Sequence, residues 1–217
     1  MAATAALALG APASAATHDV GANGNAFTGG LSFTPAEVAG TVGDVVIWTN
    51  TDFLVPHTAT EDHGLWDLSG TYGATPINPP GFGPGETRER AFEAGTFNYF
   101  CEVHPVDMRG VVRVPATVER IRRGGKARLR VIWAPAAPAE GQVFDVERRK
   151  RGEWKTVRDG TAKPKATFPG KRGAFRARLR DADDPSAASD WSPPAKPGGE
   201  PPPAGGTGDP PPSGGLY

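Results

Sequence analysis

Residues 99–108, YFCEVHPVDM, hold the only cysteine of the chain, a histidine three positions later and one of its two methionines. Thiolate, imidazole and thioether groups are the soft ligands that copper prefers. A second histidine, His57, lies upstream in the segment 45–60, VVIWTNTDFLVPHTAT. Two histidines, one cysteine and a weakly bound methionine form the ligand set of a trigonal copper site that transfers electrons.

The pattern around these residues is that of β-strands. Short apolar alternations lie between Gly, Pro, Asn and Asp clusters at a spacing of roughly eight to twelve residues, which is typical of β-sandwiches. Residues 44–50 are apolar on both faces, which predicts a central strand. Phe97, Tyr99 and Cys101 share one face of another strand, so Cys101 should point towards an aromatic interior. No segment from 17 to 192 shows a sustained helical period, and we therefore predict an all-β protein.

Residues 17–114 resemble the cupredoxins, the plastocyanin- and azurin-like small blue copper proteins. The resemblance rests on three segments, GDVVIWTNTDFLVPHTAT (43–60), FGPGETRERAFEAGTFNY (82–99) and YFCEVHPVDMRGVVRV (99–114). It implies a Greek-key β-sandwich that binds one type 1 copper, with His57, Cys101 and His104 as equatorial ligands and Met108 as the axial ligand. The step from Cys101 to His104 is plastocyanin-like and the step from His104 to Met108 is azurin-like.

The family also suggests which residues surround the ligands. A residue next to the first histidine and a nearby backbone amide usually hydrogen-bond to the cysteine sulfur, and Thr58 occupies that position here. Asn50 either ties the two ligand loops together or is an ordinary turn residue.

Two further histidines compete as ligands. His63, beside Glu61 and Asp62, would allow a zinc site with one cysteine and three histidines, but Met108 would then have no purpose. His18 is expected to be a solvated surface residue. Ser69 has no histidine and carboxylate partners that would make it a nucleophile, and we predict no enzyme activity.

Charge divides the chain into two parts. Residues 17–115 carry 12 acidic and 4 basic side chains, whereas residues 116–192 carry 10 acidic and 19 basic side chains. Such a reversal predicts a domain boundary near Pro115. Residues 116–192 resemble a fibronectin type III domain, through Trp133, the strand VFDVERR, the segment GAFRARLRD and a closing DWSPP. Phe175 stands where that family usually has tyrosine, so the hydrogen bond of a tyrosine corner would be absent.

The two ends have the composition of segments outside a folded core. Residues 1–16, MAATAALALGAPASAA, are expected to be the remnant of a secretory signal peptide or a disordered end. Residues 193–217 are rich in Pro and Gly and are predicted to be a disordered tail. No segment has the length and apolarity of a transmembrane helix.

We therefore expect an exported monomer, extracellular, on the cell surface or periplasmic, that carries single electrons on one copper. Its partner would be a redox protein with a basic rim, because Asp52, Glu102 and Asp107 lie near the ligands in sequence. Nucleic acid is not expected as a partner. The alternatives are a protein that buffers or delivers copper, and an adhesion or scaffold protein with a vestigial copper site.

Overall fold

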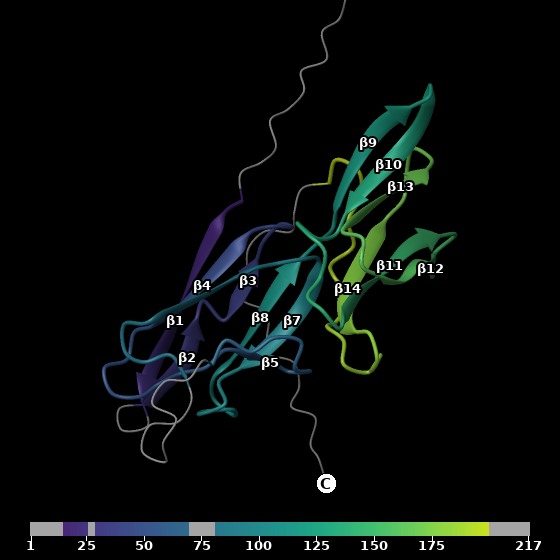
Figure 1. Ribbon diagram of the computed structural model, residues 1–217. Helices are drawn as coiled ribbons and strands as arrows, with labels where there is room; N and C mark the ends of the chain where they lie inside the picture. Colours follow the sequence, from purple (N-terminus) through teal and green to yellow (C-terminus); the bar gives the residue numbers. More distant parts are fainter. Residues whose placement is uncertain (1–14, 26–28, 70–80, 200–217) are drawn as a thin grey trace, which may run out of the picture.

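The computed structural model describes residues 15–25, 29–69 and 81–199. Within these ranges the chain forms fourteen strands and no α-helix, and hence no helix that could span a membrane (Figure 1). The strands make four sheets, which pack in pairs as two sandwiches, one built from β1–β8 and the other from β9–β14. The predicted all-β class is confirmed.

The first sandwich is formed by two four-stranded sheets. One has the order β2-β1-β4-β6 and contains β1 (Thr17–Asn25), β2 (Gly29–Thr34), β4 (Val45–Asn50) and β6 (Thr87–Ala91). The other has the order β3-β8-β7-β5 and contains β3 (Glu37–Ala39), β5 (Thr60–Glu61), β7 (Gly95–Phe100) and β8 (Arg109–Val114). The pairs β1–β4 and β3–β8 are parallel, and the other pairs are antiparallel.

Aromatic side chains fill the space between these two sheets. Strand β4 is central, as predicted, and alternate residues, among them Val46 and Trp48, are buried. Trp48 meets Tyr99 of the facing sheet edge-on, with ring centroids 5.5 Å apart. Gly110 lies opposite Tyr99 in β8, where any Cβ would collide with the tyrosine ring. Packing in this core therefore fixes the position of β7, and so of Cys101 at its end, without any contribution from a metal.

The second sandwich consists of two three-stranded antiparallel sheets. The sheet β13-β10-β9 contains β9 (Thr117–Arg123), β10 (Lys126–Ile132) and β13 (Lys165–Pro169). The sheet β12-β11-β14 contains β11 (Gln142–Lys150), β12 (Glu153–Thr161) and β14 (Phe175–Asp181). Phe168 and Phe175 join the two sheets, with ring centroids 5.1 Å apart. The likeness to fibronectin type III stays a prediction.

Backbone pairing reaches a few residues beyond the predicted domain limits, which stay a prediction. Ala16 accepts a hydrogen bond from the Val45 N–H and donates its own N–H to Asp44 Oδ1, so the ordered chain begins before Thr17. Ala195 exchanges two backbone hydrogen bonds with Phe175, so order also extends past residue 192. In both places a strand supplies a backbone partner that the local composition does not predict, β4 for Ala16 and β14 for Ala195. Residues 1–14 and 200–217 lie outside the described residues.

The segment after β14 connects the two sandwiches. Asp190 exchanges two backbone hydrogen bonds of 3.0 Å with Thr96 of β7, and its carboxylate accepts a bond from the Asn98 amide. On a neighbouring element, Gln142 Nε2 donates to the Leu65 carbonyl at 2.6 Å. Figure 1 shows β14 beside the start of β7, whereas the loop after β7 lies at the opposite end of the strand. The second sandwich thus pairs with the first residues of β7, which β5 does not cover, at the end away from Cys101.

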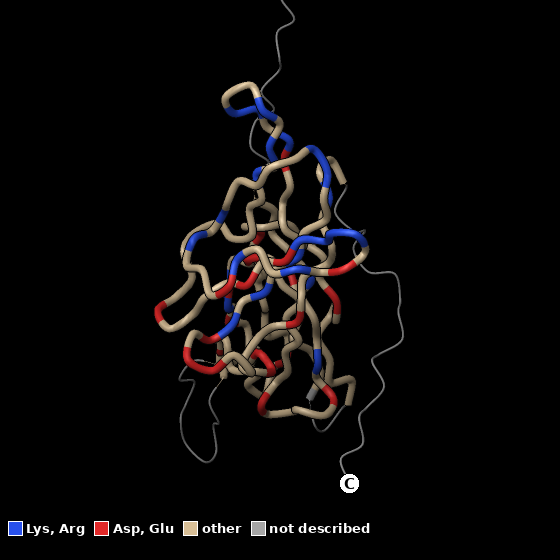
Figure 2. Tube along the Cα trace, turned by 90° about the vertical axis from the view of Figure 1, so that its right-hand side faces the viewer, with Lys and Arg blue, Asp and Glu red and all other residues tan. Residues whose placement is uncertain are grey.

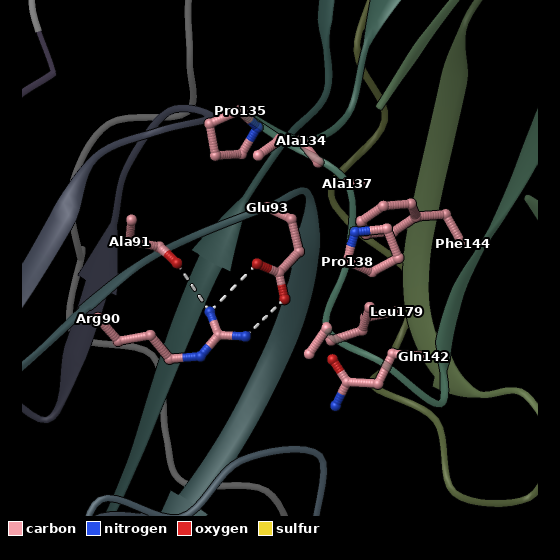
Figure 3. A pocket seen from close by; sticks show the side chains of 12 residues that line it. Arg90, Ala91, Glu93, Ala134, Pro135, Ala137, Pro138, Gln142, Phe144 and Leu179 are labelled. Carbon is pink, nitrogen blue, oxygen red and sulfur yellow. Dashed lines mark hydrogen bonds and ion pairs between the residues drawn. The ribbon is translucent and has the colours of Figure 1, made fainter. Parts of the chain in front are cut away.

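A small cleft lies at the same junction (Figure 3). Arg90 pairs with Glu93 on one side at 2.8 Å, and residues 134–139 and Phe144 of the second sandwich line the other side. None of the predicted copper ligands borders it. The surface charges follow the sequence: Figure 2 shows basic residues concentrated over the second sandwich and acidic ones towards the far end of the first.

Candidate metal centre

His57, Cys101 and His104 come together at the end of the first sandwich. Their ligand atoms all lie within 4.8 Å of one another, and Cys101 Sγ is 3.8 Å from Nδ1 of each histidine. His57 and Cys101 are fully buried, whereas His104 is partly exposed. The fold therefore brings Cys101 and His104 together with His57, although they lie more than 40 residues away from it in sequence.

The spacing of these atoms fits a trigonal metal centre. Bonds of about 2.0 Å to nitrogen and 2.3 Å to sulfur, as in zinc sites, place the ligand atoms of a trigonal centre about 3.7 Å apart. The observed sulfur–nitrogen distances are 3.8 Å. A thiolate with two imidazoles is the donor set that suits copper. The three residues would therefore hold the ion with little movement.

The loop after β7 closes on itself through backbone hydrogen bonds. The Cys101 N–H donates to the Met108 carbonyl, the His104 N–H to the Cys101 carbonyl and the Met108 N–H to the His104 carbonyl, each at 3.0 Å. Met108 is fully buried within this loop. Its role as the axial ligand stays a prediction.

The loop that carries His57 is braced against a neighbouring segment. His57 and Phe82 exchange backbone hydrogen bonds of 3.1 and 2.8 Å, and the Asn50 side-chain amide donates to the carbonyls of Val55 and Phe82. Gly81 approaches so closely that a Cβ there would lie 2.7 Å from the His57 carbonyl oxygen. Asn50 is therefore a brace of the histidine loop and makes no bond to the cysteine loop.

Thr58 is the residue that joins the two ligand loops. Its backbone N–H donates to Cys101 Sγ at 3.3 Å, which is the amide–sulfur contact expected from the family resemblance. Its hydroxyl oxygen accepts a 2.7 Å bond from the Glu102 N–H. The loop-tying role that the sequence suggested for Asn50 belongs to Thr58.

Burial holds both imidazoles in the neutral form that binds metals. Desolvation, followed by the nearby His104, lowers the pKa of His57, although Asp52 and the Gly24 carbonyl act in the opposite direction. Desolvation likewise lowers the pKa of His104, against the opposing charges of Asp107 and Asp52. Neutral imidazoles can bind a metal at neutral pH without first losing a proton.

The comparisons with known proteins agree with this geometry. Residues 20–115 match the family model for copper binding proteins of the plastocyanin/azurin family. The first sandwich is cupredoxin-like. The match and the three converging ligands support a copper site and a copper electron-transfer protein.

Several solved structures are similar to this cupredoxin-like sandwich. A purple cupredoxin from Nitrosopumilus maritimus is 28% identical, with 45% of this chain and 98% of that chain covered and a TM-score of 0.34. A copper-containing nitrite reductase from Thermus scotoductus SA-01 is 27% identical over 45% of this chain and 22% of that chain, with a TM-score of 0.32. A reduced amicyanin variant is 24% identical over 46% and 81%, with a TM-score of 0.30. A comparison with curated proteins gave no match.

The remaining candidates lie outside the cluster of ligands. His63 is 41% exposed and its Nδ1 lies 3.2 Å from Glu61 Oε1. Among the described residues it does not join the group of metal ligands. His18 is not simply solvated, since it pairs with Asp44 at 3.1 Å. The Ser69 hydroxyl donates to Asp67, which caps the same turn.

Sequence reasoning missed one residue beside the ligands. Asp52 was expected on an acidic rim, but it is 7% exposed and one of its carboxylate oxygens lies 3.7 Å from His57 Nε2. The N-x-D spacing before His57 was visible in the sequence. Only the fold of the loop shows that the carboxylate turns inward.

Proposed function

We propose that this protein is a type 1 copper electron carrier, with His57, Cys101 and His104 as equatorial ligands and Met108 as the axial ligand. The observation that carries the proposal is the thiolate–imidazole trio, which has sulfur–nitrogen distances of 3.8 Å and two buried members, His57 and Cys101. When bound, copper supplies a one-electron couple. The protein supplies fixed positions for the ligands, and the Thr58 N–H supplies a hydrogen bond to the sulfur.

Electron transfer requires a route to the surface, and the exposure of the ligands favours His104. It is the only one of the three clustered ligands that is not buried. Among the described residues, the large apolar side chains that are exposed are Phe53, Leu54 and Val106, at 72%, 56% and 84%. All three lie on the two ligand loops. We infer that they form an apolar patch next to the partly exposed ligand, which suits a small, short-lived redox interface.

We test the metal first. The purified protein should bind one Cu(II) and become intensely coloured, because the Cys101 thiolate donates charge to the metal. Cys101→Ser should lose this visible absorption completely, and His104→Ala should lose most of it. His63→Ala is the matched control, since it removes a histidine outside the cluster, and it should keep the colour. A coloured Cys101→Ser protein would show that the ligand assignment is wrong.

A copper-buffering protein is the alternative that shares this site. The two functions differ in the behaviour of the redox couple. Voltammetry of the copper-loaded protein should show a rapid and reversible one-electron wave for a carrier, and a slow or irreversible one for a buffer. Failure of the folded protein to bind copper would favour the scaffold alternative.

We also propose that the redox partner is a protein with a basic rim. Glu102 and Asp107 are exposed beside the apolar patch, whereas Asp52 is buried and adds nothing to that rim. Val106→Lys should therefore slow electron exchange with a small basic redox protein several-fold and weaken its salt dependence. Ala136→Lys adds the same charge on an exposed loop of the second sandwich and should leave the rate unchanged. If Val106→Lys exchanges electrons at the wild-type rate and keeps an intact copper spectrum, the patch is not the docking site.

The setting in which the carrier works is also part of the proposal. We infer that it is exported, because the Ala-rich start has the composition of a signal-peptide end. We also infer that it acts as a monomer without enzyme activity. Fractionation of cells that express the full chain tests the export, and light scattering of the purified protein tests the monomer.

A further inference from the structure

Asp52 occupies a place that its neighbours fix closely. Its N–H donates to Asn50 Oδ1 at 2.8 Å, and its own Oδ1 accepts hydrogen bonds from the N–H groups of Phe53 and Leu54. These bonds turn the carboxylate inward and leave Phe53 and Leu54 exposed. One carboxylate oxygen, Oδ1, therefore stabilises the turn.

The other carboxylate oxygen has no such role. Among the described residues, Asp52 Oδ2 is buried and has no hydrogen-bond partner, and the same is true of His57 Nε2, which lies 3.7 Å from it. The side chains are 1% and 0% exposed, so bulk water does not take the place of a partner. A buried carboxylate oxygen and a buried ring nitrogen that are both unpaired and face each other need a common explanation, because unpaired buried polar atoms are costly.

The explanation lies in the two forms of a neutral imidazole. A proton on Nδ1 would leave a lone pair on Nε2 directed at a negative oxygen, which is unfavourable. A proton on Nε2 gives the carboxylate a donor and leaves the lone pair on Nδ1. Nδ1 is the atom that lies 3.8 Å from Cys101 Sγ, on the side where the ligands converge.

We propose that Asp52 is a positioning residue that selects the Nε2–H tautomer of His57, presents Nδ1 to the metal and lowers the reduction potential of the site. The inference rests on the proposed copper function. A carboxylate behind a ligating histidine makes the imidazole a better donor. A fixed negative charge in a buried place also favours the more positive Cu(II) state over Cu(I), since little solvent screens it.

Asp52→Asn separates this role from that of a turn residue. Asparagine keeps an oxygen for the Phe53 and Leu54 amides but replaces Oδ2 by an NH2 group, which cannot accept the Nε2 proton. Asp107→Asn is the matched control, since it removes the same charge from an exposed position on the other ligand loop. Asp52→Ser is a second variant that retains a turn-capping oxygen and has no group long enough to reach His57.

The first measurement uses the metal-free protein. Nitrogen-15 NMR of the histidine rings should show His57 with its proton on Nε2 in the wild type and in Asp107→Asn. In Asp52→Asn and Asp52→Ser the proton should move partly or wholly to Nδ1. Unchanged His57 tautomers in both Asp52 variants would overturn the proposal, whatever the protein does with copper.

The second measurement uses the copper-loaded protein. Both Asp52 variants should keep the visible colour, bind Cu(II) about 10- to 100-fold more weakly and show a raised reduction potential. The shift for Asp107→Asn should be clearly smaller, because solvent screens its charge. If the Asp52 variants and Asp107→Asn shift the potential equally, the carboxylate does not act through His57. If the wild type binds no copper, the proposed function fails while the NMR result still decides the role of Asp52.

Discussion

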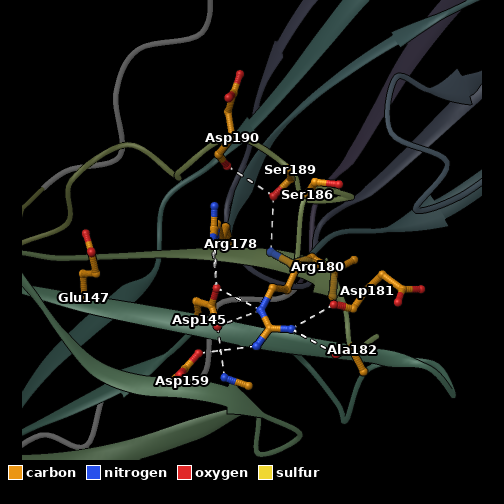
Figure 4. A network of polar contacts seen from close by, with 12 residues as sticks. Asp145, Glu147, Asp159, Arg178, Arg180, Asp181, Ala182, Ser186, Ser189 and Asp190 are labelled. Carbon is orange, nitrogen blue, oxygen red and sulfur yellow. Dashed lines mark hydrogen bonds and ion pairs between the residues drawn. The ribbon is translucent and has the colours of Figure 1, made fainter. Parts of the chain in front are cut away.

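Two of the three buried aspartates among the described residues, Asp145 of the second sandwich and Asp52 of the first, differ in how their oxygens are bound. In the second sandwich Asp145 is 5% exposed, and both of its oxygens are bound, by Arg178, Arg180 and the Gly160 N–H at about 3 Å (Figure 4). In the first sandwich Asp52 is similarly buried, yet one of its oxygens faces His57 and has no hydrogen-bond partner in the part of the chain that the structure describes. A buried charge with all its partners stabilises a fold. A buried charge that lacks partners costs stability, and the one in the first sandwich, Asp52, lies beside the ligand His57.

The largest expected effect tests the Asp145 side of this comparison. Asp145→Asn leaves two arginines without their shared carboxylate, and Arg180 is only 11% exposed. We expect the free energy of unfolding to fall by about 2–4 kcal/mol, because removal of the carboxylate charge leaves the buried guanidinium charges uncompensated. Chemical denaturation of the full chain measures this change.

Asp159→Asn provides the control for that variant. Asp159 also contacts Arg180, at 3.4 Å, but it is 81% exposed, so its loss should change stability little. The copper spectrum should be unchanged in both variants, because neither residue touches the first sandwich. An Asp145→Asn protein as stable as the wild type would show that the network contributes nothing.

A second, smaller effect concerns acid. Burial tends to raise the pKa of Asp145, but the Gly160 N–H, Arg178 and Arg180 together outweigh it and hold the pKa below its usual value of 3.8. A carboxylate whose pKa is lower in the folded state stabilises the fold above about pH 4, and this contribution is lost as the pH falls through the folded pKa. A tenfold difference between the folded and unfolded acid dissociation constants corresponds to about 1.4 kcal/mol.

The difference in unfolding free energy between wild type and Asp145→Asn should therefore shrink from pH 6 to pH 2. Other acidic groups with lowered pKa values, such as Asp44, are present in both proteins and cancel in the difference. If this difference in unfolding free energy stayed constant from pH 6 to pH 2, the negative charge of Asp145 would not be the source of the stabilisation.

The smallest expected effect on stability tests the Asp52 side. Asp52→Asn retains the oxygen that holds the turn and loses the negative charge. The oxygen that it replaces, Oδ2, makes no hydrogen bond within the described residues. We expect the unfolding free energy of the metal-free protein to change by less than about 1 kcal/mol. Thermal melts of the metal-free variant and wild type measure it. A loss as large as that for Asp145→Asn would show that Asp52 is a structural residue like its counterpart.

Much of the candidate centre was predictable because its chemistry is local. Cys101, His104 and Met108 lie within eight consecutive residues, and their side-chain types alone indicate a soft metal. The strands were also predictable, since alternation of apolar residues is a property of each segment by itself. The backbone pairing of Ala16 and Ala195 was not predictable, because it depends on strands that are distant in sequence rather than on local composition.

The sequence by itself determined the ligand types, the β-strands and the reversal of charge near Pro115, because each depends on residues that are neighbours in the chain. Only the tertiary structure decided that Thr58 joins the ligand loops, that Asp190 extends the edge of β7 and that Asp52 points inward at His57. These contacts depend on how distant segments pack and pair, or on how a loop turns. The periodicity and spacing of residues in the sequence predict neither, since they describe one segment at a time.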